Sequence, residues 1–138
     1  MTGKSKPLTL AWFLIEQEGA VLVVHQKDDG SIFAGQWTLP GDFARRGESA
    51  VDAISRFARE ELGVVILGEE FLATVPILDS GDIYEARVYR VGYEGQLRYG
   101  SSGPFSEVAW ATDTLLPSPI PSSLSALLRR LLASGPSR

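Results

Sequence analysis

Apolar residues gather in short runs along the first forty positions, and these runs predict β-strands. One run covers residues 8–16 and another covers 20–26, with Gly19 in the short gap between them. Two β-rich runs joined by a glycine-containing gap predict a hairpin. A polar loop over 27–31 contains an Asp-Gly pair, which is a turn signal, and a short strand is expected over 36–39.

The apolar spacing changes to three and four residues between Ser49 and Leu62, which predicts a helix with one apolar stripe. The stripe consists of Val51, Ile54, Ala58 and Leu62. Glu48 and Ser49 stand where the positive end of the helix dipole suits an acidic or capping residue. Gly63 is the expected stop, because glycine readily adopts the left-handed conformation that closes a helix.

The rest of the chain is mostly β-rich and ends in a second amphipathic helix. Strands are expected over 64–67, 70–78, 83–93 and 106–110, and the closing helix over 122–133. Strands outnumber helices and do not alternate strictly with them, so the pattern favours an α+β fold over a doubly wound parallel sheet.

Length and composition indicate one globular unit. The chain has 138 residues, of which 44% are hydrophobic and 22% charged. This length is typical of a single domain, here 1–138, and the apolar content suffices for a core. We expect residues 1–7 and 134–138 to be frayed.

The charge balance and the rare residue types exclude several classes of site. The net charge is −4, which argues against a nucleic-acid polymer as ligand, since that binding depends on clustered lysine and arginine. The absence of cysteine excludes disulfides and thiolate metal sites, and the single histidine excludes a His-rich zinc site. No apolar run approaches the ~20 residues of a membrane span, and a cytoplasmic location is the default expectation.

The end of the first predicted helix carries candidate chemistry. Glu60 and Glu61 are adjacent there, where the helix dipole disfavours negative charge unless a cation compensates. Asp52, Arg56 and Glu60 follow one another at intervals of four, so an ion-pair ladder is expected along one face. Glu61 has no partner in its own column, which makes it a plausible ligand of a hard cation such as Mg²⁺.

The segment from Trp37 to Val64 resembles the Nudix box, and the surrounding strands resemble that family over residues 8–133. Without a gap, the chain supplies the approach residues and most of the box. These are Trp37, Leu39, Pro40, Gly41, Glu48, Arg56, Ala58, Glu60, Glu61, Gly63 and Val64. The resemblance implies a Nudix fold, in which a mixed β-sheet is sandwiched between helices.

Two box positions depart from the family pattern. Asp42 replaces the first glycine, and Phe57 stands where the family usually has a metal-binding glutamate. Losing one of about three acidic ligands weakens a cage for Mg²⁺. We therefore expect a shifted metal site of Asp42, Glu60 and Glu61.

The resemblance implies a metal-dependent hydrolase of a nucleoside-diphosphate-linked substrate, such as a nucleotide or nucleotide sugar, with Mg²⁺ or Mn²⁺ as cofactor. Glu61 is the leading candidate base, Glu60 is next, and Arg56 orients the ligands. The predicted substrate contacts are Arg45 and Arg46, whose guanidinium groups match phosphate oxygens, and Trp37.

Two alternatives to the hydrolase remain open at this point. The first is a non-catalytic module that binds a nucleotide or diphosphate as a sensor or partner domain, which Phe57 and the acid-free loop 100–104 favour. The second is an inert interaction scaffold. The oligomeric state is also open, with a homodimer as one alternative.

Overall fold

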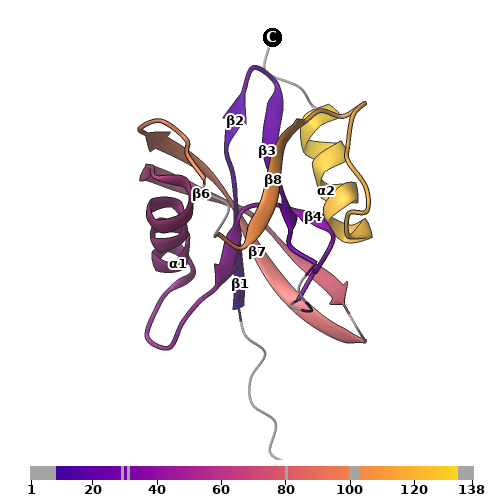
Figure 1. The fold of residues 1–138 in the computed structure, drawn as a ribbon, viewed down its shortest axis with the longest axis horizontal. Helices are drawn as coiled ribbons and strands as arrows, with labels where there is room; N and C mark the ends of the chain where they lie inside the picture. The colour runs from indigo at the N-terminus through magenta and orange to yellow at the C-terminus, as the bar shows by residue number, and fades with distance from the viewer. Residues whose placement is uncertain (1–8, 29, 31, 80, 100–102, 134–138) are drawn as a thin grey trace, which may run out of the picture.

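The computed structural model describes residues 9–28, 30, 32–79, 81–99 and 103–133. The ends that were expected to fray, at 1–7 and 134–138, lie outside these residues, as do positions 100–102 of the acid-free loop. The described residues form two four-stranded β-sheets with helices on opposite sides (Figure 1). The architecture confirms the predicted α+β class.

The first sheet is mixed and has the strand order β5-β1-β7-β6. Its strands are β5 (Gly41–Phe43), β1 (Thr9–Leu14), β7 (Asp82–Glu94) and β6 (Val65–Asp79). β1 pairs with β7 in parallel, whereas β1–β5 and β6–β7 are antiparallel. The two runs predicted over 64–67 and 70–78 are one strand, β6, with pairing irregularities near Ile66–Gly68 and Phe71–Ala73. Pairing with β7 continues across the polar residues between the two runs, so the separate-strand prediction was wrong.

The second sheet is antiparallel and is built around β3 (Ala20–Gln26). β2 (Glu16–Gln17) and β4 (Trp37–Thr38) pair with successive parts of β3, and β8 (Phe105–Ala111) also pairs with it. The predicted hairpin is therefore real but short. Only the two residues of β2 form it, while the apolar run before them, β1, belongs to the other sheet.

Both faces of the central strands are buried, which explains why their sequences are apolar without alternation. In β1, Leu10, Trp12 and Leu14 enter one core cluster, which also contains residues of α2 (Ser122–Ala133). Ala11 and Phe13 enter a second cluster, together with residues of α1 (Ala50–Phe57). The sheets therefore lie between the two helices, as Figure 1 shows.

Glycine is required where β5 approaches β1. Gly41 has a φ of +148°, and a Cβ atom there would collide with the Ala11 carbonyl oxygen and the Trp12 backbone. The close approach lets Ala11 and Trp12 pair with Asp42 and Gly41. The same approach places the Asp42 backbone directly beside the core strand that forms one wall of the site.

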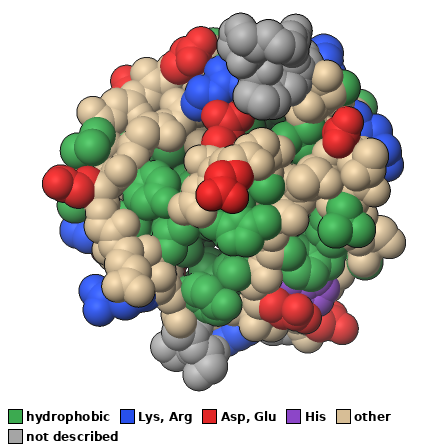
Figure 2. Space-filling model, turned by 90° about the horizontal axis from the view of Figure 1, so that it is seen from above, with side chains coloured by type: hydrophobic (Ala, Val, Ile, Leu, Met, Phe, Trp, Pro, Cys, Tyr) green, Lys and Arg blue, Asp and Glu red, His purple; other side chains and the backbone are tan. Residues whose placement is uncertain are grey.

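The surface combines charged side chains with exposed apolar ones. On the face shown in Figure 2, hydrophobic side chains gather toward the middle and charged ones lie mostly nearer the edge. None of the helices in the described part of the chain has the length and apolarity needed to cross a membrane.

Candidate active site

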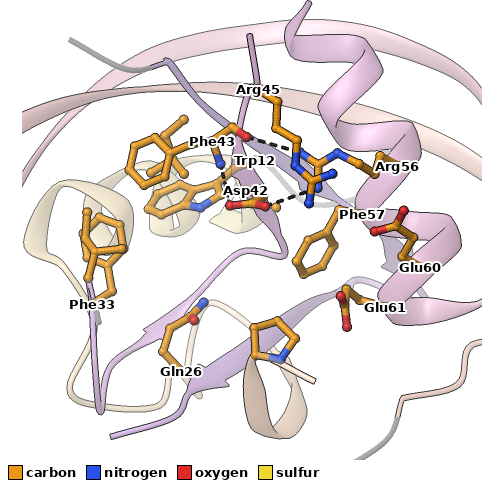
Figure 3. A pocket seen from close by; sticks show the side chains of 14 residues that line it. Trp12, Gln26, Phe33, Asp42, Phe43, Arg45, Arg56, Phe57, Glu60 and Glu61 are labelled. Atoms are coloured by element: carbon orange, nitrogen blue, oxygen red, sulfur yellow. Dashed lines mark hydrogen bonds and ion pairs between the residues drawn. The ribbon is translucent and has the colours of Figure 1, made fainter. Parts of the chain in front are cut away.

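A cavity of about 320 Å³ lies between α1, β1 and the loop around β5 (Figure 3). Its apolar lining includes the aromatic side chains of Trp12, Phe33, Phe43 and Phe57. Its charged lining consists of Asp42, Arg45, Arg56, Glu60 and Glu61. An aromatic wall facing a charged wall suits a ligand that has a planar apolar part and an anionic part.

The helix that carries the charged wall begins with a capping box. The Ser49 side chain accepts a hydrogen bond from the Asp52 backbone N–H at 3.0 Å, and the Asp52 carboxylate accepts one from the Ser49 N–H at 3.1 Å. These bonds satisfy two of the free N–H groups of the first turn. The signal for a helix start at Ser49 is therefore confirmed, with Asp52 completing the box.

The helix widens before it ends. α1 continues into a π-helical turn, η1 (Ala58–Leu62), which closes at Gly63 with a φ of +71°. π-Helical turns occur frequently at functional sites. This turn carries Glu60 and Glu61 at the C-terminal end of the helix, where the dipole disfavours their negative charge. A cation beside them would offset that unfavourable interaction.

Arg56 is buried and joins the helix to the loop that precedes it. Its Nε and Nη2 donate to Glu48 at 2.8 and 3.0 Å, and Nη1 donates to Asp42 at 3.3 Å. Nη2 also donates to the Phe43 carbonyl oxygen at 3.3 Å. A planar guanidinium suits this set of acceptors, because its donors form a rigid fork.

The pKa values of the ion pair reflect this network. The Arg56 guanidinium and the Arg45 backbone N–H hold the pKa of Glu48 at about 2, well below its usual value. Hydrogen bonding to Glu48 raises the pKa of Arg56. Glu48 therefore braces the loop between β5 and α1 instead of lining the cavity, as its place before the helix predicted.

The predicted Asp52–Arg56–Glu60 ladder does not form. Asp52 caps the helix, and Arg56 turns inward, where Glu48 and Asp42 pair with it and only 8% of the residue remains exposed. Glu60 instead has a long contact of 3.8 Å with Arg59. The interval-of-four rule fails here because it describes solvent-exposed helix faces, and this face is covered by the loop.

The Asp42 carboxylate lies in the cavity but is already engaged. One oxygen accepts from the Phe43 backbone N–H at 2.7 Å and the other from Arg56 at 3.3 Å. About 44% of the side chain is exposed, so its remaining lone pairs can face a ligand. The expected metal site of Asp42, Glu60 and Glu61 therefore has three carboxylates that line one cavity, one of them shared with an arginine.

Phe57, which stands where the box resemblance implies a carboxylate, has a buried aromatic ring. The residue is 5% exposed and packs against Phe13 and Phe105, with ring centroids 6.1 and 6.2 Å away. Figure 3 shows its ring between Asp42 and Glu61. The ring continues the core to the cavity surface and keeps the space between these two carboxylates apolar.

Only one of the three predicted substrate contacts lines the cavity. Arg45 lines the cavity, whereas Arg46 and Trp37 are not among the lining residues. Trp37 packs against His25 at 5.0 Å between ring centroids, and His25 contacts Ser106 and the Gly35 carbonyl oxygen. His25 thus has a hydrogen-bond partner on each ring nitrogen.

One lining residue, Phe33, has features that sequence spacing does not reveal. Phe33 adopts a φ of +61°, which is uncommon for a residue other than glycine, and its ring packs against Trp12 at 5.8 Å. Its backbone N–H donates to Asp79 at 3.3 Å, which fixes the loop against the end of β6. The aromatic loop residue beside an Asp-Gly turn was the one available signal. Backbone strain of this kind is common at ligand-binding sites.

The resemblance implies a divalent metal, and the cavity offers carboxylate ligands for one. Within the described ranges, no group of three or more acidic or histidine side chains is gathered closely enough to hold an ion. Glu60 and Glu61 nevertheless supply two adjacent hard oxygen ligands at the cavity. Mg²⁺ commonly keeps several waters and binds to one or two carboxylates together with substrate phosphates. The residues therefore fit an ion shared with a phosphorylated ligand.

Comparison with known proteins identifies a family that covers most of the chain. The family model described as NUDIX domain matches residues 5–131. The nucleoside triphosphatase NudI of Escherichia fergusonii is 44% identical over 55 residues, which are 40% of this chain and 39% of that protein. The chain thus spans about two fifths of the curated relative's length.

Solved structures share the fold over nearly the whole chain. The MutT NUDIX hydrolase of Burkholderia pseudomallei superposes with a TM-score of 0.76 at 25% identity, covering 96% of this chain and all of that one. The MutT protein of Methanosarcina mazei Go1 gives a TM-score of 0.80 at 20% identity, with coverage of 98% and 100%. The second likeness shows the shared fold alone.

Proposed function

The chain belongs to the NUDIX domain family, and from this membership we propose that it hydrolyses the diphosphate linkage of a nucleotide, with a nucleoside triphosphate as the leading substrate. NudI, a nucleoside triphosphatase, is the relative that suggests the triphosphate. The observation that carries the proposal is the placement of Glu60 and Glu61 in one cavity with an arginine and an aromatic wall.

The cavity offers a separate place for each part of a nucleotide. Phe43 presents apolar surface suited to a nucleobase, and the buried rings of Trp12 and Phe33 lie behind it. Arg45 stands on the charged side, where its guanidinium can bind a phosphate. Glu60 and Glu61 then face the phosphates. A linkage bound in this way lies beside the carboxylates while the base remains against the aromatic side chains.

Each charged residue has a role that follows from its position. Glu61 accepts the proton of the attacking water, with Glu60 as the second candidate for that role. Glu60 and Glu61 would hold Mg²⁺ or Mn²⁺ together with the substrate phosphates, and Asp42, across the Phe57 ring, is the candidate third ligand. A bound ion would lower the pKa of its water and neutralise charge on the leaving phosphate. Arg56 acts as a positioning residue, because it fixes Asp42 and Glu48 relative to the helix.

A second candidate function rests on Phe57. Its buried ring stands where a carboxylate would complete the donor set, and no three-carboxylate group forms among the described residues. These two observations favour a module that binds a nucleotide without hydrolysing it. Such a sensor would use the same cavity and the same aromatic wall.

The deciding experiment is a panel of nucleoside triphosphates, dinucleoside polyphosphates and nucleotide sugars, assayed with Mg²⁺ or Mn²⁺. We expect turnover, and we expect E61Q to lower kcat by a factor of about 10² to 10⁴, the usual contribution of a general base. The matched control is E69Q, because Glu69 is an exposed carboxylate on β6 that does not line the cavity. Nucleotide binding without turnover anywhere in the panel would support the sensor.

The shifted metal site has its own test, with Mn²⁺ titrated into the protein alone. We expect both E61Q and D42N to weaken Mn²⁺ binding relative to E69Q. Full retention in D42N together with loss in E61Q would show that Asp42 does not replace the missing ligand.

A further inference from the structure

A second cavity adjoins the two glutamates on another side. It has a volume of about 300 Å³ and is lined by Arg59, Glu60, Glu61, Gly63, Arg98 and Tyr99. Glu60 and Glu61 line this cavity as well as the first one, so the pair forms the boundary between the two. Figure 3 shows both carboxylates at the edge of the first cavity. A ligand bound in the first cavity can therefore continue past the glutamates into the second.

Arg98 is held at this boundary by the backbone. Its N–H donates to the carbonyl oxygen of Leu62 at 2.8 Å, which ties the segment after β7 to the end of the helix. Its side chain lies over Gly63, where Nε would be 3.4 Å from an added Cβ atom. The guanidinium therefore packs over Gly63 at the end of the helix, in the same cavity as the two glutamates.

The two arginines of the second cavity have donors to spare. Among the described residues, the Arg98 guanidinium makes no hydrogen bond or ion pair, although two carboxylates line the same cavity. Arg59 has a contact of 3.8 Å with Glu60, and 66% of its side chain is exposed. Such exposed pairs are weak. Two guanidinium groups with free donors beside a carboxylate pair suit an anion placed next to a shared cation.

We propose that Arg98, assisted by Arg59, binds the terminal phosphates of a nucleoside triphosphate in this second cavity. This inference rests on the proposed function and names the substrate feature that the site selects. The nucleoside lies in the first cavity with Arg45, the phosphate chain crosses Glu60 and Glu61, and its outer end meets Arg98 and Arg59. Crossing two carboxylates requires a cation between them and the phosphates, so binding should depend on Mg²⁺.

The consequence is a substrate preference. A nucleoside triphosphate places anionic oxygens in the second cavity, whereas a nucleotide sugar places a neutral sugar there. A guanidinium forms paired hydrogen bonds with the former and gains little from the latter. Arg98 is thus a specificity-determining residue that discriminates between these substrate classes.

The test compares R98Q, R98K and the control R129Q, because Arg129 is an exposed arginine on α2 that lines neither cavity. R98Q should raise KM for a nucleoside triphosphate about tenfold or more, as expected for a lost charged hydrogen bond. It should change KM for the matching nucleoside diphosphate sugar less than twofold. The KM of R98K for the nucleoside triphosphate should lie between those of R98Q and the unaltered protein. R129Q should leave KM unchanged for both substrates.

Binding of inorganic tripolyphosphate with and without Mg²⁺ gives a readout independent of turnover. We expect R98Q to weaken this binding about tenfold with Mg²⁺ present, even if no nucleotide is hydrolysed, so failure of the proposed function would be recognised separately. Equal losses for triphosphate and nucleotide sugar, or unchanged tripolyphosphate binding in R98Q, would overturn the inference. A lower melting temperature of R98Q with an unchanged preference would assign Arg98 to the helix end alone, and would also overturn it.

Discussion

Replacing Phe57 by glutamate tests whether the buried ring is what limits the metal site. F57E would place a carboxylate at the cavity, with Glu60 and Glu61, at the position where the box resemblance implies one. The matched control is F57Q, because glutamine has nearly the same shape as glutamate and removes the same ring without adding a charge. Both variants remove the ring contacts with Phe13 and Phe105.

The cost in stability follows from the burial of the ring. Phe57 is 5% exposed, and truncation of a buried phenylalanine typically costs about 3–5 kcal/mol. For a chain of this size, 1 kcal/mol corresponds to roughly 3–5 °C in Tm, so F57Q should melt about 10–20 °C lower. Without metal, F57E should melt lower than F57Q, because its carboxylate is buried beside Glu60 and Glu61. The loss is smaller than the total stability of most domains, about 5–15 kcal/mol, so both should remain folded in the cold.

The assay is thermal unfolding with increasing Mn²⁺. If the new carboxylate joins Glu60 and Glu61, a Mn²⁺ concentration about 100 times Kd should return about 2.7 kcal/mol to F57E. That gain corresponds to roughly 10 °C, and F57Q should gain far less at the same concentration. Hydrolysis by F57E should rise in parallel, since the added ligand holds the ion more firmly.

Two outcomes would contradict a limiting role of the Phe57 ring. Equal responses of F57E and F57Q to Mn²⁺ would mean that a carboxylate at this position does not reach the ion. Improved Mn²⁺ binding with unchanged hydrolysis would separate metal retention from catalysis. If the ring limits the metal site, both Mn²⁺ binding and hydrolysis rise in F57E and neither rises in F57Q.

Two further predictions concern the scaffold of the site. In the folded chain the pKa of Glu48 is lowered to about 2. As the pH falls below about 4.5, Glu48 therefore becomes protonated in the unfolded chain while it is still ionised in the folded one. The stabilisation of the folded chain by the Glu48–Arg56 ion pair is therefore present above about pH 4.5 and is lost as the pH approaches 2. In E48Q, Tm should be lower at pH 7 and decline less between pH 4.5 and 2, whereas parallel Tm profiles would contradict this role. G41A should lose more than about 4 kcal/mol in urea unfolding, because its Cβ would collide with Ala11, and a loss under about 1 kcal/mol would show that β5 can move away from β1.

Local signals in the sequence predicted the elements whose ends depend on nearby residues. The closing helix at 122–133 and the strand at 20–26 have the predicted bounds. Gly63 ends the first helix with the expected left-handed φ of +71°. In each case periodicity and a cap or turn residue lie within a few positions of one another, so the sequence contains the necessary information locally.

Pairing between distant segments could not be predicted in this way. β1 pairs in parallel with β7, for example Thr9 with Glu85, so the first apolar run leaves the hairpin and joins the other sheet. Nothing in its composition distinguishes the two outcomes, because both faces of the strand are buried in either sheet. The positive φ of Phe33 has the same origin, since it is fixed by contacts with Trp12 and Asp79.

At the candidate site, too, the sequence identified the residues but not their contact partners. The box spacing identified Glu60, Glu61 and Arg56, and all three line the cavity. The partners of Arg56 were predicted wrongly because a solvent-exposed ladder was assumed, whereas the loop before the helix covers that face. The second cavity went unnoticed, because Arg98 is 37 residues from Glu61 and only the folded chain brings them to one cavity.

The balance of charge around Glu60 and Glu61 gives the substitution at Phe57 a physical meaning. A cage of three carboxylates can hold a cation without substrate, whereas two carboxylates with arginines on either side attract the ion and the phosphates together. Arg45 lies in the first cavity, and Arg59 and Arg98 line the second. The two glutamates thus lie between two cavities that together carry these three arginines, with the apolar ring of Phe57 beside them. An ion retained in this setting depends on the phosphates that accompany it, so Mn²⁺ alone should bind more weakly than Mn²⁺ with tripolyphosphate.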